Sequence, residues 1–425
     1  MPKILQLQKI LSREVKQLFD LKVSDYELET LLPTESTESR EEIFSQIAWS
    51  VICEPGDGLA GLMVQTLGAK RALVNELDSV PAQEVRAQLI AAGLDSFELD
   101  QHDVFEKGFL VGRERWRPRI SLTNVRQALF RIQQSNGFVI TPMHPAWPGS
   151  LDDLRSHSPM ALWIRGSLES LQKLQKSVAV VGCRGSSSYG ELATQNMVSA
   201  AVEKGFSIVS GGAYGIDGIA HRCALALKAN TVAVMAGGVD KFYPSGHADL
   251  LKRISETGAV ISELPPGSAP TKWRFLQRNR LIAALSQATL VVEANWRSGA
   301  LNTATHAQTL ERPLLAVPGP ITSPKSAGTN KLIADERATL VVDGRDFLDR
   351  LGARPELKMD FELAGLGSIE TRVLDALGFN SLELSEVCAE AGLTRDEARF
   401  GLGNLELDGF VVRRGSAWTK SQTTL

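Results

Sequence analysis

Short apolar runs alternate with longer helical patterns between residues 178 and 342. Each run has three to five residues, many of them β-branched, as in a buried strand. The predicted strands are Val178–Val181, Ser207–Val209, Thr231–Met235, Ala259–Ile261, Thr289–Val292, Leu314–Val317 and Leu340–Val342. The predicted helices begin near Tyr189, Ile216, Ser245, Phe275, Gly299 and Ala327. Because parallel strands need a crossover between them, this alternation predicts an α/β fold: a doubly wound, mainly parallel, Rossmann-like sheet with helices on both faces.

The chain before this region follows a different pattern. Residues 1–40 are polar and charged, and we expect a lead-in without a core of its own. From Glu41 onward apolar residues recur at helical spacing, interrupted by Pro55-Gly56-Asp57-Gly58. This predicts a small helical domain over residues 41–135, similar to SAM or helix-hairpin-helix domains. Its glycine-bearing turn is either a tight connection or a grip on a DNA backbone, and both interpretations stay open.

Two further segments flank the predicted sheet. Residues 138–166 are rich in proline and tryptophan, and we expect an extended segment that covers the edge of the sheet within a domain over residues 138–350. A linker over residues 351–365 leads to a winged-helix domain over residues 366–421. Its predicted parts are the helices Ser368–Leu377, Leu384–Ala391 and Arg395–Leu407 and a hairpin over residues 409–418.

The charge of the chain is distributed unevenly. The whole chain has a net charge of −3, which excludes a uniformly basic nucleic-acid-binding protein. Residues 1–177 carry 20 basic and 23 acidic groups, residues 178–350 carry 18 and 14, and residues 351–425 carry 8 and 12. Only the middle segment is basic, at +4, so we expect any anion-binding patch to lie there. The acidic tail favours contact with a protein over direct DNA recognition by the winged helix.

The composition also bears on compartment and cofactors. The four cysteines form no CxxC pair, which is typical of reduced thiols in a cytoplasmic protein. The N-terminus lacks the apolar core of a signal peptide, and no stretch of 18 apolar residues predicts a membrane span. The histidines show no metal-ligand spacing, and we predict neither a metal nor a cofactor.

The loops that follow the predicted strands are rich in glycine, serine and proline. In an open parallel sheet, ligands bind outside the carboxyl ends of the strands. These loops are Gly182–Ser186, Ser210–Asp217, Gly237–Pro244, Ser262–Gly267, Glu293–Ala300 and Pro318–Pro320. Glycines and helix N-termini let backbone N–H groups reach a phosphate, so the rim predicts a phosphate-bearing ligand. The alternative is that short strand-to-helix turns need glycine whatever they bind.

The segment Thr271–Arg280 combines cations with aromatic rings. It holds four basic residues and no acidic one, with Trp273 and Phe275 between them. Cations beside rings that stack on bases are typical of sites for single-stranded nucleic acid. A solvated helix start with both rings in the core would give the same pattern. If the segment binds nucleic acid, we expect Arg184, Lys272 and Arg278 to converge on one concavity.

Several enzyme classes are disfavoured by missing motifs. No Gly-Lys-Ser or Gly-Lys-Thr is present, so a Walker A loop is absent from the sequence. Arg184 stands at the second glycine position of a dinucleotide-binding turn. His221 fits a general base or a hydrogen-bonded structural histidine, and Glu263 and Glu293 fit either a carboxylate pair or loop caps. We therefore assign no catalytic residue.

Ordered motifs across residues 138–350 resemble the DprA/Smf family of DNA-processing proteins. They include Ser210-Gly211-Gly212-Ala213-x-Gly215-Ile216-Asp217, Val234-Met235-Ala236-Gly237-Gly238-Val239-Asp240-x-x-Tyr243-Pro244, Arg278-Asn279-Arg280-Leu281-Ile282-Ala283, Ser298-Gly299-Ala300 and Val317-Pro318-Gly319. The helical lead and the winged helix are similar to domains that many members append.

The resemblance implies a non-enzymatic protein that binds single-stranded DNA, forms a homodimer and loads the RecA recombinase during natural transformation. By motif, it implies backbone and base contacts from Arg184, Lys272, Phe275, Arg278, Asn279 and Arg280. It implies a cradle formed by Ser210, Gly211, Gly212, Ser298 and Gly299. Two alternatives stay open, namely a nucleotide-processing enzyme similar to phosphoribohydrolases and a dimeric interaction adaptor.

Overall fold

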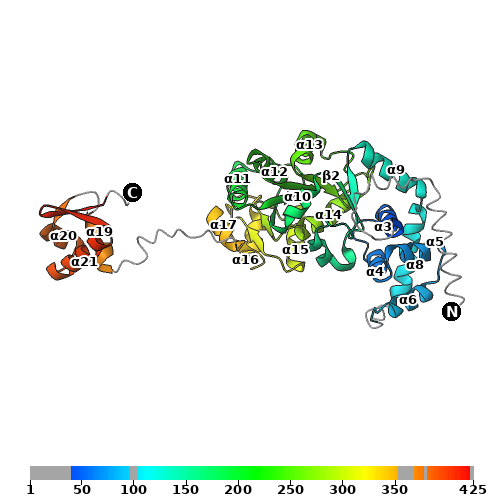
Figure 1. The fold of residues 1–425 in the computed structure, drawn as a ribbon, viewed down its shortest axis with the longest axis horizontal. Helices are drawn as coiled ribbons and strands as arrows, with labels where there is room; N and C mark the ends of the chain where they lie inside the picture. Colours follow the sequence, from blue (N-terminus) through cyan, green and yellow to red (C-terminus); the bar gives the residue numbers. More distant parts are fainter. Residues whose placement is uncertain (1–39, 96–103, 353–367, 378–380, 422–425) are drawn as a thin grey trace. The chain divides into compact units, whose positions relative to one another are not determined.

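The structure is a computed structural model that describes residues 40–95, 104–352, 368–377 and 381–421 (Figure 1). The chain divides into two compact units, residues 1–353 and 354–425, which we describe separately. The predicted lead-in over residues 1–40 and the predicted linker over residues 351–365 lie almost wholly outside the described residues. Within the described part of the chain, no helix is long and apolar enough to cross a membrane.

A nine-stranded sheet forms the centre of the first unit, in the order β1-β2-β6-β5-β4-β3-β7-β8-β9. The strands are β1 Phe138–Ile140, β2 Leu162–Gly166, β3 Ser177–Val181, β4 Ser207–Ser210, β5 Thr231–Val234, β6 Ala259–Ser262, β7 Ala288–Val291, β8 Leu314–Ala316 and β9 Thr339–Leu340. The seven strands β3 to β9 are parallel, which confirms the predicted mainly parallel sheet.

The proline- and tryptophan-rich segment enters the sheet as strands, where only an extended edge cover was expected. β1 pairs antiparallel with β2, and β2 pairs antiparallel with β6. Trp163 stands opposite Ser262, and its indole is fully buried. Pairing satisfies the backbone N–H and C=O groups that β6 would otherwise leave open at the sheet edge.

Helices cover both faces of the sheet, as the alternating pattern predicts (Figure 1). Successive residues of β3 point to opposite faces: Val178 and Val180 pack on one side, and Ala179 and Val181 on the other. The first face carries α11 Ser188–Glu203, α12 Ile216–Ala226, α13 Ala248–Thr257 and α17 Gly344–Arg350. The second face carries α10 Leu168–Gln172, α14 Lys272–Ala284, α15 Gly299–Thr309 and α16 Ala327–Ala334. Short 3-10 turns are η1 Arg117–Arg119, η2 Gly149–His157, η3 Lys173–Gln175 and η4 Ser245–His247.

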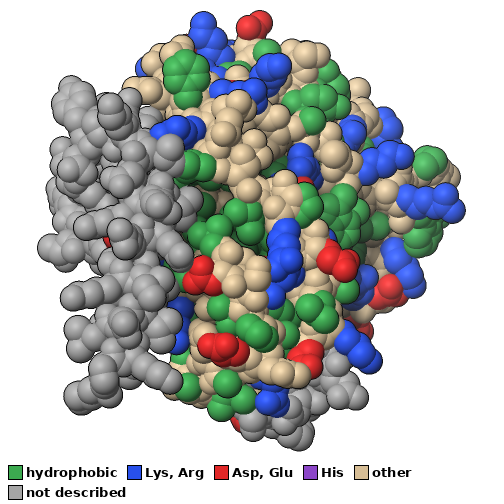
Figure 2. All heavy atoms as spheres, turned by 90° about the vertical axis from the view of Figure 1, so that its right-hand side faces the viewer, with side chains coloured by type: hydrophobic (Ala, Val, Ile, Leu, Met, Phe, Trp, Pro, Cys, Tyr) green, Lys and Arg blue, Asp and Glu red, His purple; other side chains and the backbone are tan. Residues whose placement is uncertain are grey.

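The N-terminal helices pack on the β1–β2 end of the sheet. They are α3 Arg40–Ile52, α4 Gly58–Leu67, α5 Ala69–Leu77, α6 Ala82–Ala91, α8 Val104–Trp116 and α9 Leu122–Gln134. Trp49 and Trp116 meet edge to face at 5.5 Å in a core that continues to Trp163 and Val260 of the sheet. Cationic and anionic side chains are interspersed over this end of the molecule (Figure 2).

The glycine-bearing turn before α4 is half-buried and forms a tight connection. Asp57 caps α4 by accepting a hydrogen bond from the N–H of Ala60 at 3.2 Å. The N–H of Gly56 donates to Glu263 at 3.3 Å. At Gly61 a methyl group would lie 1.8 Å from the carbonyl oxygen of Ser156, so only glycine allows this approach of α4 to η2. The turn therefore makes contacts within the chain.

The second unit has the predicted winged-helix elements. They are α19 Ser368–Leu377, α20 Leu384–Ala391, α21 Arg395–Leu407, β11 Val411–Arg414 and β12 Ala417–Lys420. Gly392 ends α20 in the left-handed region, with φ of 60°, and Thr394 and Glu397 form a capping box at the start of α21. One short strand was not predicted: β10 Leu382–Glu383 pairs with β12.

Candidate nucleic-acid interface

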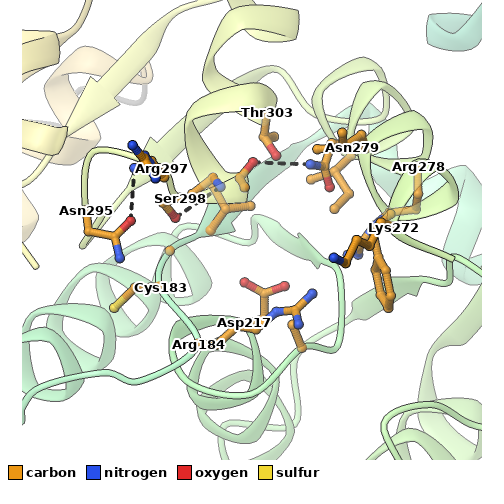
Figure 3. Close-up of a pocket in the computed structure, with 18 of the residues that line it drawn as sticks. Cys183, Arg184, Asp217, Lys272, Arg278, Asn279, Asn295, Arg297, Ser298 and Thr303 are labelled. Carbon is orange, nitrogen blue, oxygen red and sulfur yellow. Dashed lines mark hydrogen bonds between the residues drawn. The ribbon is translucent and has the colours of Figure 1, made fainter. Parts of the chain in front are cut away.

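A cavity of about 880 Å³ opens at the carboxyl ends of β3 and β7 (Figure 3). From β3 the chain proceeds through β4, β5 and β6 on one side, whereas β7, β8 and β9 lie on the other. The strand order therefore reverses between β3 and β7, and ligands of open α/β sheets bind at such a switch point. The loops after both strands line the cavity, together with the first turns of α14.

The cavity is strongly cationic. Its lining holds the five cations Arg184, Lys272, Arg278, Arg297 and Lys325, and one acid, Asp217. Five positive charges and one negative charge give a net charge of +4, although the whole chain has −3. A concave site with this charge concentrates anions.

The basic residues of the segment Thr271–Arg280 lie on two different sides of helix α14. Thr271 caps the helix by accepting from the N–H of Arg274 at 3.2 Å. Lys272, Phe275 and Arg278 line the cavity. The guanidinium of Arg274 instead contacts Glu54 at 2.6 Å, on the side of the N-terminal helices. Half of the predicted basic segment is thus paired with carboxylates of the same chain, since Arg280 pairs with Glu263 at 2.6 Å.

Four residues predicted for the site, Ser210, Gly211, Gly212 and Arg280, do not line this cavity, although Gly211 lines a smaller hollow that shares Arg184 and Phe275 with it. Arg280 is only 3% exposed and is held by the carboxylate of Glu263. Ser210 is buried, and its hydroxyl donates to the carbonyl of Val180 at 2.6 Å. Gly212 is buried with φ of 65°, and its carbonyl oxygen lies 3.0 Å from Nδ1 of His247. These residues support the rim from beneath.

Arg278 lies in the cavity wall, mostly buried and facing Asp217. Its Nη1 donates to the carbonyl of Val234 at 2.9 Å. Burial lowers the pKa of Arg278 to about 10, against the opposing effect of Asp217. Burial raises the pKa of Asp217, while the charge of Arg278 lowers it. A methyl group at Gly211 would lie 1.6 Å from Nη1 of Arg278, so this predicted cradle glycine makes room for the guanidinium.

Aromatic rings stand beside the cations on the α14 side. The ring of Phe275 lies 5.7 Å from that of Tyr243, and the guanidinium of Arg184 lies 5.1 Å from the Phe275 centroid. Arg184, Tyr243 and Phe275 also line an adjoining hollow with Tyr214. The arrangement offers ring faces for stacking next to charges that hold an anion.

The N-terminus of α15 contributes backbone groups to the opposite wall. Ser298 caps this helix by accepting from the N–H of Ala300 at 3.3 Å. Added methyl groups at Gly185 and Gly299 would meet no atom within 4 Å, so both glycines face open space. Asn279 joins the walls by donating to the carbonyl of Gly299 at 3.2 Å. A helix N-terminus beside an open glycine favours phosphate.

Other rim glycines serve close packing within the protein. A methyl group at Gly182 would lie 2.4 Å from Cγ1 of Ile216, and one at Gly215 would lie 2.2 Å from the carbonyl oxygen of Cys183. The interpretation that short turns need glycine is therefore correct at these positions. Gly185 and Gly299 are the rim positions that remain open toward the cavity.

The acid–base candidates have structural partners. His221 is fully buried, its Nδ1 lies 2.7 Å from Oγ1 of Thr231, and burial lowers its pKa to about 3. Glu293 accepts from the N–H of Ser187 at 3.0 Å and from its hydroxyl at 2.5 Å. Glu263 pairs with Arg280. These contacts support the structural interpretation of all three residues.

Arg297 and Lys325 are cavity cations that the sequence reasoning did not single out. Arg297 lies in the loop after β7, and Lys325 in the segment after β8, where its Nζ donates to the carbonyl of Ser186 at 3.1 Å. Both follow the carboxyl end of a parallel strand. Searching every such segment for cations would have identified them.

Two family models match the chain. The model described as DNA recombination-mediator protein A matches residues 138–352, and the DprA winged helix domain matches residues 359–415. The first covers the sheet and its cavity, and the second covers most of the C-terminal unit.

Known proteins agree with these matches. The chain is 39% identical over 303 residues to a DNA processing protein DprA of Mycobacterium tuberculosis, covering 68% of this chain and 78% of that protein. It is 34% identical over 228 residues to DprA of Bacillus subtilis, covering 53% and 75%. The X-ray structure of DprA from Streptococcus pneumoniae is 28% identical with a TM-score of 0.54, covering 72% of this chain and 95% of that one. The chain therefore belongs to the DprA/Smf family of DNA-processing proteins.

Proposed function

We propose that the cavity between β3 and β7 binds single-stranded DNA. Arg184, Lys272 and Arg278 hold phosphates together with the N-terminus of α15, and Phe275 stacks on a base. The observation that carries this proposal is the convergence of five cations and an aromatic pair in one cavity of about 880 Å³ at the switch point of the sheet.

A single strand fits this chemistry better than a duplex does. In a duplex the bases are stacked inside and their faces are out of reach, whereas an unpaired base can stack on a ring. The guanidinium of Arg184 lies against the ring of Phe275, with Tyr243 beside it, and an unpaired backbone can bring phosphate and base together there. The remaining acidic charge of the chain disfavours non-specific binding elsewhere.

Family membership supports a role beyond binding. The sheet unit matches the model of a recombination mediator, and we propose that the bound strand is passed to the RecA recombinase in the cytoplasm during natural transformation. We further propose that the protein acts as a homodimer and is not an enzyme. RecA filament formation on strands coated with single-strand-binding protein, measured with and without this protein, tests the transfer. Sedimentation equilibrium tests the dimer.

The binding proposal is tested by reversing one exposed cavity charge. Lys272→Glu is expected to weaken binding to oligo-dT on the order of tenfold, because it removes a phosphate contact and adds repulsion. The slope of log affinity against log salt should fall by about 0.7 for each lost phosphate contact. Lys204→Glu is the matched control. It makes the same charge change at the C-terminal end of α11, which lies at the amino ends of the parallel strands and so away from the cavity.

The comparison has a clear negative outcome. Equal affinities and salt slopes for wild type, Lys272→Glu and Lys204→Glu would refute DNA binding in this cavity. Equal losses in both variants would assign binding to the general charge of the protein.

A further inference from the structure

Two of the seven tryptophans are exposed, and each adjoins in sequence a residue that lines the cavity. Trp49, Trp116 and Trp163 are at most 1% exposed, and Trp147 and Trp418 are partly buried. Trp273 and Trp296 are 57% and 66% exposed. An indole is normally largely buried, so an exposed one between residues that line a cavity is a candidate for contact with a ligand.

The loop that carries Trp296 has a defined shape. Its neighbours Asn295 and Arg297 both line the cavity. Oδ1 of Asn295 accepts from the N–H of Arg297 at 3.1 Å, and the carbonyl of Asn295 accepts from the N–H of Ser298 at 3.1 Å. Ser298 in turn caps α15. Trp296 is therefore presented at a turn closed by two hydrogen bonds and anchored to a helix.

This loop and the start of α14 lie on opposite sides of the cavity. Figure 3 shows Asn295, Arg297 and Ser298 on one side, and Lys272 and Arg278 on the other. Arg184 and Asp217 lie between the two groups in the same view. Phe275 and Lys272 line the cavity on the α14 side, and on the opposite side Trp296 stands between the lining residues Asn295 and Arg297 in the sequence.

We propose that Trp296 is a second base-stacking platform, so that one DNA strand crosses the cavity from Phe275 to Trp296. This inference rests on the proposed function and adds a second contact region to it. The indole stacks on an unpaired base of any sequence, and Arg297 meets the adjoining phosphate. A mononucleotide is too short to engage both walls, whereas an oligonucleotide can.

The first test separates stacking from charge. Trp296→Ala is expected to weaken oligo-dT binding by about fivefold to about 150-fold, the range for loss of one stacked base. Its salt slope should stay that of the wild type, because no charge is lost. Trp296→Phe, which keeps a ring, should retain most of the affinity. Leu227→Ala is the control, since Leu227 is 45% exposed at the C-terminal end of α12, at the opposite edge of the sheet.

The second test uses tryptophan fluorescence. Stacking of a base on an exposed indole should quench emission when oligo-dT is added, and Trp296→Phe should remove part of that quenching. dTMP at equal nucleotide concentration should quench less than oligo-dT, because it does not span both walls.

The outcomes distinguish this inference from the proposed function. Unchanged affinity in Trp296→Ala and unchanged quenching in Trp296→Phe, while Lys272→Glu still weakens binding, would overturn the inference alone. If Lys272→Glu also has no effect on binding, both this inference and the proposed DNA binding in the cavity are refuted. A change in sedimentation of Trp296→Ala without loss of DNA affinity would assign the indole to an interface between copies, and would likewise overturn the inference.

Discussion

His221 illustrates at the scale of one residue why a candidate base serves structure. It is fully buried under the rim, and its Nδ1 contacts the hydroxyl of Thr231, which itself donates to the carbonyl of Ile208 at 2.9 Å. Burial is the main cause that lowers the pKa of His221 to about 3, and the nearby His247 and Arg278 act in the same direction. Such an imidazole stays neutral at physiological pH.

This pKa predicts a loss of stability in acid. The unfolded chain takes up the proton near pH 6.5 and the folded chain only near pH 3, so the contribution of His221 is complete above pH 6.5 and falls as the pH drops toward 3. Between pH 7 and pH 5 the free energy of unfolding should fall by about 2 kcal/mol from this residue. Urea unfolding at both pH values measures the fall. His221→Gln should show a correspondingly smaller fall, and an equal one would contradict the assignment.

At the scale of elements, α14 shows how one helix serves two purposes. Its cavity side carries Lys272, Phe275 and Arg278. Its other side contacts the turn of the N-terminal helices, where Glu54 holds Arg274 and also accepts from Arg119 at 2.8 Å. The N-terminal helices therefore stabilise the position of the helix that carries Lys272, Phe275 and Arg278.

Helix α21 gives a prediction about element stability from two neighbouring glycines. A methyl group at Gly401 would lie 2.8 Å from Ile369, whereas one at Gly403 would meet no atom within 4 Å. Gly403→Ala should stabilise the winged-helix unit by about 1 kcal/mol through helix propensity. Gly401→Ala should destabilise it by about 1–3 kcal/mol through overpacking. Amide hydrogen exchange of α21 in the full chain compares the two variants. Changes of the same sign would show that packing at Gly401 is wrongly described.

At the scale of the whole molecule, charge and chain organisation point to a separable DNA-binding unit. All residues lining the cavity belong to the first unit, over residues 181–325. The tail from residue 361 onward carries ten acidic and six basic residues, a net charge of −4. The second unit has a hydrophobic core of its own, built around residues such as Val373, Leu377 and Leu402.

Removing residues 361–425 should therefore leave oligo-dT affinity within about twofold of the full chain, since no charge of the cavity is lost. Fluorescence anisotropy with labelled oligo-dT measures it, and Lys272→Glu in the shortened chain serves as control. A tenfold or larger loss would show that the winged helix shares in binding the strand. Unchanged binding with lost stimulation of RecA would support a protein-contact role for this domain.

The sequence by itself determined the parallel strands, the helices between them, their order and the family. Strands buried on both faces need continuous apolar runs, and helices that cover them need apolar residues at helical spacing. Both patterns are local, so they can be recognised in the sequence. The helices of the winged-helix unit could also be predicted from their capping residues, such as Gly392 and Thr394. The loops at the carboxyl ends of the strands predicted the edge of the sheet at which the cavity lies.

Only the tertiary structure decided which cations face the cavity. Arg274 and Arg280 look equivalent to Lys272 and Arg278 in sequence, but Glu54 comes from 220 residues away to pair with Arg274. Arg297 joins the site only because β7 lies beside β3 in the sheet. A charge remains available to a ligand when folding leaves it outside an internal ion pair. The carboxylates of such pairs can come from distant segments, which a local sequence pattern does not place.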